Sequence, residues 1–215
     1  MKLKNALPRK ASREHRRQQL IEATIRSLAK RGFAQTTLSD VAATAGVSHG
    51  LVNFHFNTKE MLLTETLLFM AAEYQANWTK ALAAAAPDPA SQLEALILAD
   101  FNDAICTPDR LAAWCAFWGE AQSRPIYLEQ CGANDRDYIV MKEEVCRRLV
   151  AEGGYAIDAA RAARVLRVTV EGVWLDLMST LEPYPKQEAL KTVFFCPSAF
   201  FPQHFDIDGR RGLRR

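Results

Sequence analysis

The chain has 215 residues, of which 49% are hydrophobic and 24% charged, enough for one large domain or a small domain joined to a larger one. No run of about eighteen uncharged apolar residues occurs, so a transmembrane helix is not predicted. The basic segment Met1 to Lys10 is not followed by the apolar stretch of a secretory signal, and the expected location is the cytoplasm.

The net charge of +2 conceals an uneven distribution. Residues 1–60 hold eleven Lys and Arg against four Asp and Glu, whereas the other 155 residues hold sixteen against twenty-one. A basic head on an acidic body indicates that one end of the protein meets a polyanion. A solvated helix face would give the same count, so charge alone does not decide between the two.

The five cysteines are widely spaced, form no CxxC pair and have no histidine at the spacing of metal ligands. We therefore expect free cysteines in a helical core, no metal and no cofactor. A redox sensor is the alternative, but no pattern favours it.

The first segment has helical periodicity, with apolar residues three or four positions apart and Gly32 as its expected end. Thr37 and Asp40 have the spacing of a capping box, and they predict a short helix that stops at Gly46.

Ser48 is the expected cap of a third short helix, and Asn57 with Glu60 is the expected capping pair of a long helix over about 59–86. Proline and glycine then separate five more predicted helices. These cover residues 90–105, 109–122, 125–152, 156–181 and 186–203. Residues 206–215 lack apolar periodicity and are expected to form a flexible tail. The sequence therefore predicts an all-α fold.

The predicted helix over 156–181 is apolar on nearly all sides. The apolar positions are Leu166, Val170, Val173, Trp174 and Leu177 on one stripe, and Val165, Val168, Leu175 and Met178 elsewhere. Because a surface helix has a single apolar stripe, this pattern indicates a helix covered on several sides, as in a subunit interface.

The segment from Phe33 to Leu63 predicts a helix-turn-helix. Ala42 and Ala45 are small enough for two helices to cross closely, and Gly46 allows the tight turn between them. The residues that the second helix presents outward are Ser48, His49, Gly50, Asn53 and His55. Such a helix can read base edges in the major groove of DNA, while its amides meet a phosphate. A helical hairpin without a DNA role is the alternative.

From about Arg16 to Leu63 the chain resembles the DNA-binding domain of the tetracycline-repressor (TetR) family of bacterial transcriptional regulators. The shared positions are Ala23, Gly32-Phe33, Thr37-Leu38, Val41-Ala42, Ala45 to Ser48, Gly50, His55-Phe56, Lys59 and Leu62-Leu63. The resemblance implies that four residues contact DNA phosphates, namely Thr37, Ser48, His55 and Lys59. It also implies that His49, Gly50 and Asn53 lie over base edges. The family commonly has a tyrosine where this chain has Asn53, a departure that affects the backbone contact at this position.

A basic arm precedes this motif. Its residues are Arg9, Lys10, Arg13, Arg16 and Arg17. If the arm is flexible, it can reach a neighbouring phosphate or the minor groove. A solvated tail is the alternative.

For the rest of the chain the resemblance implies a domain that binds a small effector and pairs, through helices 156–181 and 186–203, with a second subunit as a four-helix bundle. Residues 111–130 and 169–178 are further similar to the choline-responsive repressors of glycine-betaine synthesis genes. The shared features are Ala113-Trp114, Ala116-Phe117-Trp118, Pro125 and Gly172-x-Trp174-Leu175. We therefore expect a DNA-binding domain over 1–58, an effector-binding and dimerisation domain over 59–205 and a tail over 206–215.

Aromatic residues of the second domain suit a cationic effector. The candidates for a cage are Trp114, Phe117, Trp118, Tyr127, Tyr138 and Trp174. A quaternary ammonium group gains about 0.5–2 kcal/mol over each well-placed aromatic face. The candidates for a counter-charge are Asp100, Glu120 and Glu171. Ordinary core packing of the aromatics and solvation of the carboxylates are the alternatives.

The sequence therefore predicts a ligand-responsive repressor that binds a palindromic DNA operator as a homodimer. Choline or a related quaternary ammonium compound is the expected effector, and no membrane partner is expected. One alternative is a DNA-binding regulator with a different effector or none; a pocket filled by its own side chains would favour that alternative. Another is a small helical enzyme, but the sequence has no nucleophile elbow, P-loop, dinucleotide fingerprint or HExxH motif.

Overall fold

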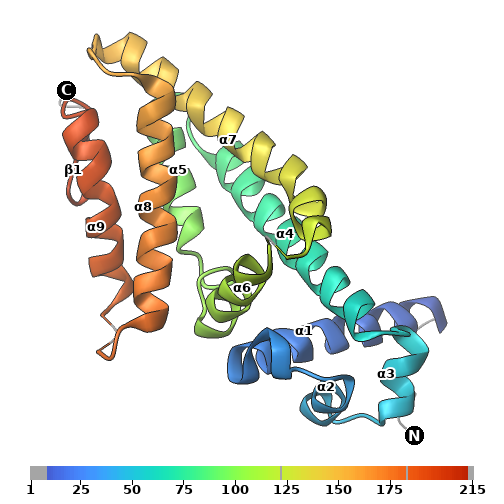
Figure 1. Ribbon diagram of the computed structural model, residues 1–215. Coiled ribbons are helices and arrows are strands. Elements are labelled where there is room, and N and C mark those ends of the chain that lie inside the picture. Colours follow the sequence, from blue (N-terminus) through green and yellow to red (C-terminus); the bar gives the residue numbers. More distant parts are fainter. Residues whose placement is uncertain (1–8, 122, 183, 213–215) are drawn as a thin grey trace, which may run out of the picture.

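The computed structural model describes residues 9–121, 123–182 and 184–212, and the all-α prediction is confirmed. The helices are α1 (Arg9–Gln35), α2 (Leu38–Ala45), α3 (His49–His55), α4 (Lys59–Ala84), α5 (Pro89–Asp100), α6 (Pro108–Glu120), α7 (Pro125–Gly153), α8 (Ala159–Ser179) and α9 (Lys186–Phe200). In Figure 1, α1 to α3 lie at one end of the molecule, and α4 and α7 run diagonally away from them. Helices α8 and α9 pack side by side at the far side.

Side-chain caps determine where most helices begin. Thr37 and Ser48 cap α2 and α3 as predicted, by accepting hydrogen bonds from backbone amides three residues ahead. The predicted Asn57 cap is wrong, because the Thr58 hydroxyl accepts the bond from the Met61 amide at 3.1 Å. Thr58 stands directly before the first helical residue, which is the position that a cap requires.

Several helix ends differ from the predictions, including the start of α8 at Ala159 rather than 156 and the end of α9 at Phe200 rather than 203. Gly32 breaks α1 with a φ of 75°, as expected, but one further short turn follows and ends at Gln35. Helix α5 ends at Asp100 rather than at 105, because Asn102 starts a turn in which its side-chain oxygen accepts a bond from the Ala104 amide.

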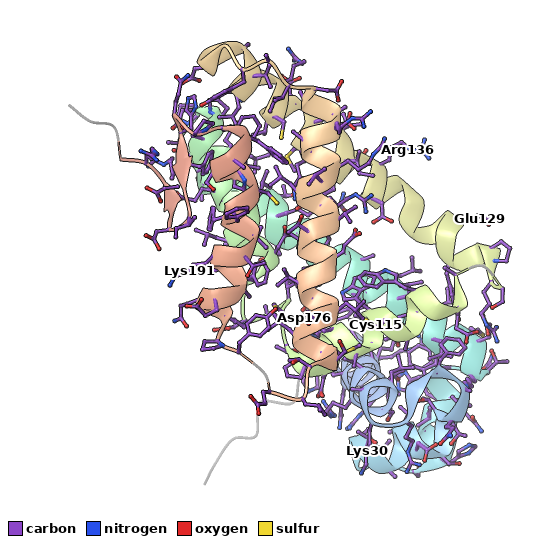
Figure 2. All side chains as sticks on the ribbon, turned by 60° about the vertical axis from the view of Figure 1, so that its left-hand side comes forward. Lys30, Cys115, Glu129, Arg136, Asp176 and Lys191 are labelled. Atoms are coloured by element: carbon purple, nitrogen blue, oxygen red, sulfur yellow. The ribbon has the colours of Figure 1, made fainter. Side chains whose placement is uncertain are left out.

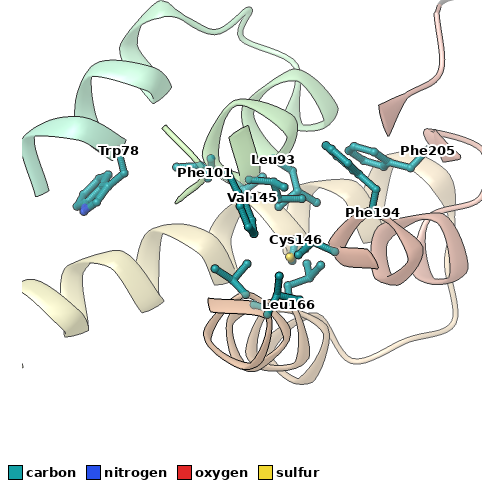
Figure 3. Close-up of a cluster of buried hydrophobic side chains, with 14 of the residues drawn as sticks. Trp78, Leu93, Phe101, Val145, Cys146, Leu166, Phe194 and Phe205 are labelled. Atoms are coloured by element: carbon teal, nitrogen blue, oxygen red, sulfur yellow. The ribbon is translucent and has the colours of Figure 1, made fainter. Parts of the chain in front are cut away.

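Two buried clusters hold the helices together. The larger one draws side chains from α4, α5, α7, α8 and α9, and Figure 3 shows them converging. The labelled residues of Figure 3 are Trp78, Leu93, Phe101, Val145, Cys146, Leu166, Phe194 and Phe205. The other cluster lies around α1 to α3, but it also includes Ala113 and Phe117 of α6 and Tyr127 of α7. Packing around the N-terminal helices therefore extends well beyond residue 58.

Residues 206–210, the first part of the expected flexible tail over 206–215, belong to a short hairpin instead. Strands β1 (Phe205–Asp206) and β2 (Gly209–Arg210) form a short antiparallel hairpin. Phe205 is fully buried and stacks on Phe194 of α9, and the Arg210 amide donates to the Glu94 carboxylate of α5 at 2.8 Å. An aromatic anchor in a short polar segment carries no periodicity, so the sequence pattern could not reveal it.

We expect Leu166→Ala to lower the free energy of unfolding by about 2–5 kcal/mol, because Leu166 of α8 is fully buried in the larger cluster and its truncation leaves a cavity. Urea unfolding at one fixed protein concentration measures this change. Leu181→Ala is the matched control, since Leu181 is 99% exposed and should leave stability unchanged. Equal effects of the two substitutions would contradict the packing described here.

Candidate functional site

The helix-turn-helix is built by local hydrogen bonds. The Thr37 hydroxyl accepts from the Asp40 amide at 3.2 Å, and the Asp40 carboxylate accepts from the Thr37 amide at 3.0 Å, which completes the predicted capping box. Gly46 adopts the left-handed conformation, with φ of 67° and ψ of 36°. The turn that follows sets α3 at a defined angle to α2.

Helix α1 supports this motif from behind. The Gln19 side-chain amide donates to the Ala45 carbonyl at 2.9 Å, and the hydroxyls of Ser27 and Thr44 are 3.1 Å apart. Val52 and Phe56 are fully buried beneath α3. One face of α3 is thereby held against the core, and the opposite face is left to solvent.

The exposed face of α3 and its cap contain four of the five residues that were predicted to point outward, including all three predicted base-reading residues. Ser48, His49, Gly50 and Asn53 are all exposed, and the side chains of His49 and Asn53 lie 3.3 Å apart, one helical turn from each other. An added Cβ at Gly50 would meet no atom within 4 Å, so this position leaves room for an approaching surface. Phe54, which the sequence analysis did not single out, is 68% exposed on the same short helix.

His55 does not point outward as predicted. It is 8% exposed, and its Nδ1 atom has no hydrogen-bond partner in the described residues. Burial, together with the nearby Arg13 and Arg17, lowers the pKa of His55 and favours the neutral ring. The reason is helical geometry: His55 follows the buried Val52 by three positions and therefore shares its inward face.

Lys59 and the basic arm serve as structural contacts in this conformation. The Lys59 ammonium donates to the carbonyls of Phe33 and Ala34 at 2.9 and 3.0 Å, at the end of α1. The Arg17 guanidinium pairs with Glu65 of α4 at 2.9 Å and lies over the Phe56 ring. Arg13, Arg16 and Arg17 lie within α1 rather than in a flexible arm, and the side chains of Arg9 and Lys10 fall outside the described part of the chain.

All six predicted effector-binding aromatics line one pocket of about 240 Å³. The lining residues are Leu67 and Tyr74 of α4, Asp100 of α5, Trp114, Phe117 and Trp118 of α6, Ala121, Tyr127, Asp135, Tyr138, Ile139 and Lys142 of α7 or just before it, and Arg167, Val170, Glu171 and Trp174 of α8. Figure 2 shows α6, which carries Cys115, between the N-terminal helices and α8, which carries Asp176. A void lined by tryptophans opposes the alternative of a domain filled by its own side chains.

The aromatics do not all offer a free face. Trp114 and Trp118 are stacked, with ring centroids 6.2 Å apart, and Trp118 is 44% exposed. Phe117 and Tyr127 are buried and pack edge to face against each other. The face of Tyr138 is occupied by the Lys142 ammonium, 4.5 Å from the ring centroid.

Among the described residues, the charged side chains of the pocket form two pairs and leave one carboxylate, that of Asp135, without an ion-pair partner. The Asp100 carboxylate is fully buried and accepts hydrogen bonds from the hydroxyls of Tyr74 and Tyr138. Its Oδ2 atom lies 3.6 Å from the Nζ atom of Lys142. The Arg167 and Glu171 side chains are 2.5 Å apart. Of the predicted counter-charges, Asp100 and Glu171 therefore line the pocket, whereas Glu120 does not and pairs with Arg124 instead.

Asp135 was missed by the sequence analysis, because nothing in its neighbourhood marks it as a pocket residue. No ion-pair partner for it occurs among the described residues. Asp135 retains exposed surface, yet the pocket walls desolvate its carboxyl group and, with Glu171, raise its pKa. A bound cation would stabilise the charged form.

Helix α6 connects the pocket with the helix-turn-helix. The Arg110 guanidinium, at the start of α6, binds Glu22 of α1 at 3.1 Å and Glu73 of α4 at 3.0 Å. At the other side, the Tyr127 hydroxyl donates to Glu60 in the first turn of α4 at 3.2 Å. Tyr127, which lines the pocket, is thus bonded directly to α4, and α6, which forms a wall of the pocket, is bonded to α1 and α4 through Arg110.

Other kinds of site find little support in the described part of the chain. No group of three His, Cys, Asp or Glu side chains there could hold a metal ion. Four cysteines are free in the structure, while Cys131 lies outside the described side chains. None of the helices in the described ranges is both long enough and apolar enough to cross a bilayer.

Two known protein families match this chain, one over the helix-turn-helix and one over the domain that contains the pocket. Residues 20–66 match the bacterial regulatory proteins of the tetR family, and residues 89–194 match the C-terminal domain of the BetI-type transcriptional repressor. The HTH-type transcriptional regulator BetI of Burkholderia mallei (strain NCTC 10229) is 32% identical over 188 residues, which are 86% of this chain and 93% of that protein.

Solved structures show the same fold. A transcriptional regulator from Pseudomonas aeruginosa PAO1 is 30% identical and has a TM-score of 0.71, covering 86% of this chain and 88% of that chain. A regulator from Saccharomonospora viridis, solved in complex with choline, is 18% identical with a TM-score of 0.74, covering 86% and 96%.

These relatives are regulators of transcription, so the alternative of a small helical enzyme is set aside. The chain belongs to the TetR family of bacterial transcriptional regulators and is a repressor with a BetI-type C-terminal domain.

Proposed function

We propose that the protein binds a palindromic operator as a homodimer and releases it when a small quaternary ammonium compound, choline or a relative, enters the aromatic pocket. The observation that carries this proposal is that α6 forms a wall of the pocket and also packs on α1 of the helix-turn-helix. A ligand in the pocket would therefore contact a helix that packs directly on α1, which supports the proposed DNA-binding surface.

Operator contacts come from the exposed face of the helix-turn-helix. His49, Gly50 and Asn53 face the bases, and Thr37 and Ser48, both exposed, are positioned for phosphates. Lys59 remains a candidate phosphate contact if its ammonium exchanges one of its two carbonyl partners for a phosphate oxygen. His55 is not included, because it is buried.

A second copy of the chain pairs through α8 and α9. These helices leave large apolar side chains in solvent: Val168 is 52%, Leu175 50% and Phe195 65% exposed. Exposed apolar side chains gathered on two packed helices mark an interaction surface. A four-helix bundle across a twofold axis would cover them and set two α3 helices about 34 Å apart, one turn of DNA.

The pocket suits a small cation. Its 240 Å³ is below the range of about 300–1,000 Å³ typical of sites for drug-sized ligands. Trp118 and Trp114 offer aromatic surface, and Asp135 offers a carboxylate without an ion-pair partner in the described residues. The choline complex of the Saccharomonospora viridis regulator shows that this fold can hold such a cation, but at 18% identity it identifies no residue of this chain.

Release follows from linkage between the two sites. An effector that binds more tightly when α6 is displaced favours a conformation in which the two α3 helices no longer match successive turns of DNA. Operator and effector then weaken each other's binding by the same factor.

The first prediction concerns the operator. We expect His49→Ala to weaken specific binding by roughly 5- to 150-fold, because a base-edge contact contributes about 1–3 kcal/mol. Fluorescence anisotropy on DNA from the protein's own promoter region, over a range of salt concentrations, measures the loss. Thr79→Ala, an exposed position on α4, is the neutral control. If the wild type shows no sequence preference there or in a selected random library, the DNA-binding proposal fails.

The second prediction concerns the effector. Trp118→Ala should weaken choline binding by roughly 2- to 30-fold, because one cation–π contact of about 0.5–2 kcal/mol is lost. Titration calorimetry measures the affinity for choline. Anisotropy measures the choline concentration that releases the operator, and this concentration should rise by the same factor as the dissociation constant of choline. Leu181→Ala should change neither. If saturating choline does not change operator binding, choline is not the effector, but the proposal of a DNA-binding repressor still holds.

The third prediction concerns the dimer. Leu175→Glu should produce a monomer, because it places a charge in the apolar surface that the partner covers. Light scattering after gel filtration measures the mass. Leu98→Glu is matched in residue type and exposure, 47% against 50%, but lies on α5 and should remain dimeric. Dimers in both variants would refute an interface at this surface.

A further inference from the structure

Lys142 of α7 is a buried ammonium group in the wall of the aromatic pocket. The residue is 1% exposed, and its Nζ atom has no hydrogen-bond partner among the described residues. An ammonium has three donors and loses its hydration on burial, so leaving all three unpaired is strongly unfavourable. The Lys142 ammonium therefore needs a hydrogen-bond acceptor that none of the described residues provides.

The neighbours of Lys142 hold it in place without satisfying its donors. The nearest Asp100 oxygen is 3.6 Å from Nζ, beyond hydrogen-bond distance, and the Asp100 carboxylate already accepts the hydroxyls of Tyr74 and Tyr138 at 2.8 and 3.0 Å. The Tyr138 ring adds a cation–π contact. These groups fix the ammonium beside the cavity with its hydrogen-bonding capacity unused.

The pocket therefore combines two unlike binding elements. Helix α6 contributes the stacked faces of Trp114 and Trp118, which attract a cation, whereas α7 contributes the ammonium of Lys142, which attracts an anion. The other cation of the lining, Arg167, is already paired with Glu171. A purely cationic ligand would use the aromatic faces and the Asp135 carboxylate, but it would give the donors of Lys142 no acceptor.

We propose that the effector is a zwitterion, with a quaternary ammonium head on the tryptophan faces and a carboxylate that accepts hydrogen bonds from Lys142. This inference rests on the proposed effector site and narrows its ligand class, since choline has an uncharged hydroxyl in place of the carboxylate. A carboxylate on a buried ammonium makes charge-assisted hydrogen bonds, which are stronger than those of a neutral acceptor.

The test compares matched ligands on the full-length protein by titration calorimetry. The probes are trimethylammonio-acetate, -propionate and -butyrate, each paired with the alkyltrimethylammonium ion of the same chain length, together with choline. At least one zwitterion should bind tenfold or more tightly than its alkyl counterpart. If no zwitterion exceeds its counterpart, the inference is overturned.

Variants assign the effect to Lys142. Because Lys142→Met alone leaves the Asp100 charge buried without its partner, the decisive variant is the double substitution Asp100→Asn with Lys142→Met, with folding checked by circular dichroism and operator binding. The ratio of zwitterion to alkyl-cation affinity should fall to about one in this variant. Lys80→Met, at an exposed position of α4 outside the pocket and the proposed dimer surface, is the matched control and should keep the wild-type ratio.

The outcomes separate this inference from the proposal beneath it. If the zwitterion advantage survives in the double variant, Lys142 is not the carboxylate site and the inference fails. If alkyl cations and choline bind but a carboxylate adds nothing, the inference fails and the cationic effector stands. If none of these compounds binds while operator binding persists, the quaternary ammonium class fails as well.

Discussion

The packing of α6 against α1 is the contact on which both functional surfaces depend. Arg110 binds carboxylates of α1 and α4, and Phe117 meets Phe33 with ring centroids 6.1 Å apart. The same helix lines the pocket with Trp114 and Trp118. Because protein interiors are close-packed, α6 cannot move at the pocket without changing its contacts with α1. A ligand that repositions α6 therefore acts on the support of the helix-turn-helix.

Hydrogen bonds to two carboxylates tie the walls of the pocket together. Asp100 is held by two tyrosine hydroxyls next to Lys142, and Glu60, which is exposed, joins Tyr127 of the pocket to the start of α4. The buried charges of Asp100 and Lys142 are costly to desolvate, and removing one of them leaves the other uncompensated.

The candidate site was predictable where its residues act through local patterns. Thr37, Gly46 and Ser48 have their roles because capping and turn geometry depend only on residues a few positions apart. Trp114 and Trp118 were predicted to act together because residues four positions apart lie next to each other on one face of a helix. His55 was misplaced because the family motif marks it for phosphate contact, whereas it shares the inward face of α3 with Val52, next to Arg17 of α1.

The sequence by itself determined the helical fold, most of the helix boundaries, the helix-turn-helix with its exposed face, and the aromatic set of the pocket, because each depends on periodicity, caps or a local motif. Only the tertiary structure decided which charges enter the pocket. Asp135 and Lys142 join it through the packing of α7 on α4 and α8, and Glu120 is drawn away by Arg124. It also decided that Phe205 anchors the segment after α9. Contacts between residues far apart in the chain leave no trace in local spacing, and these contacts set the chemistry of the pocket.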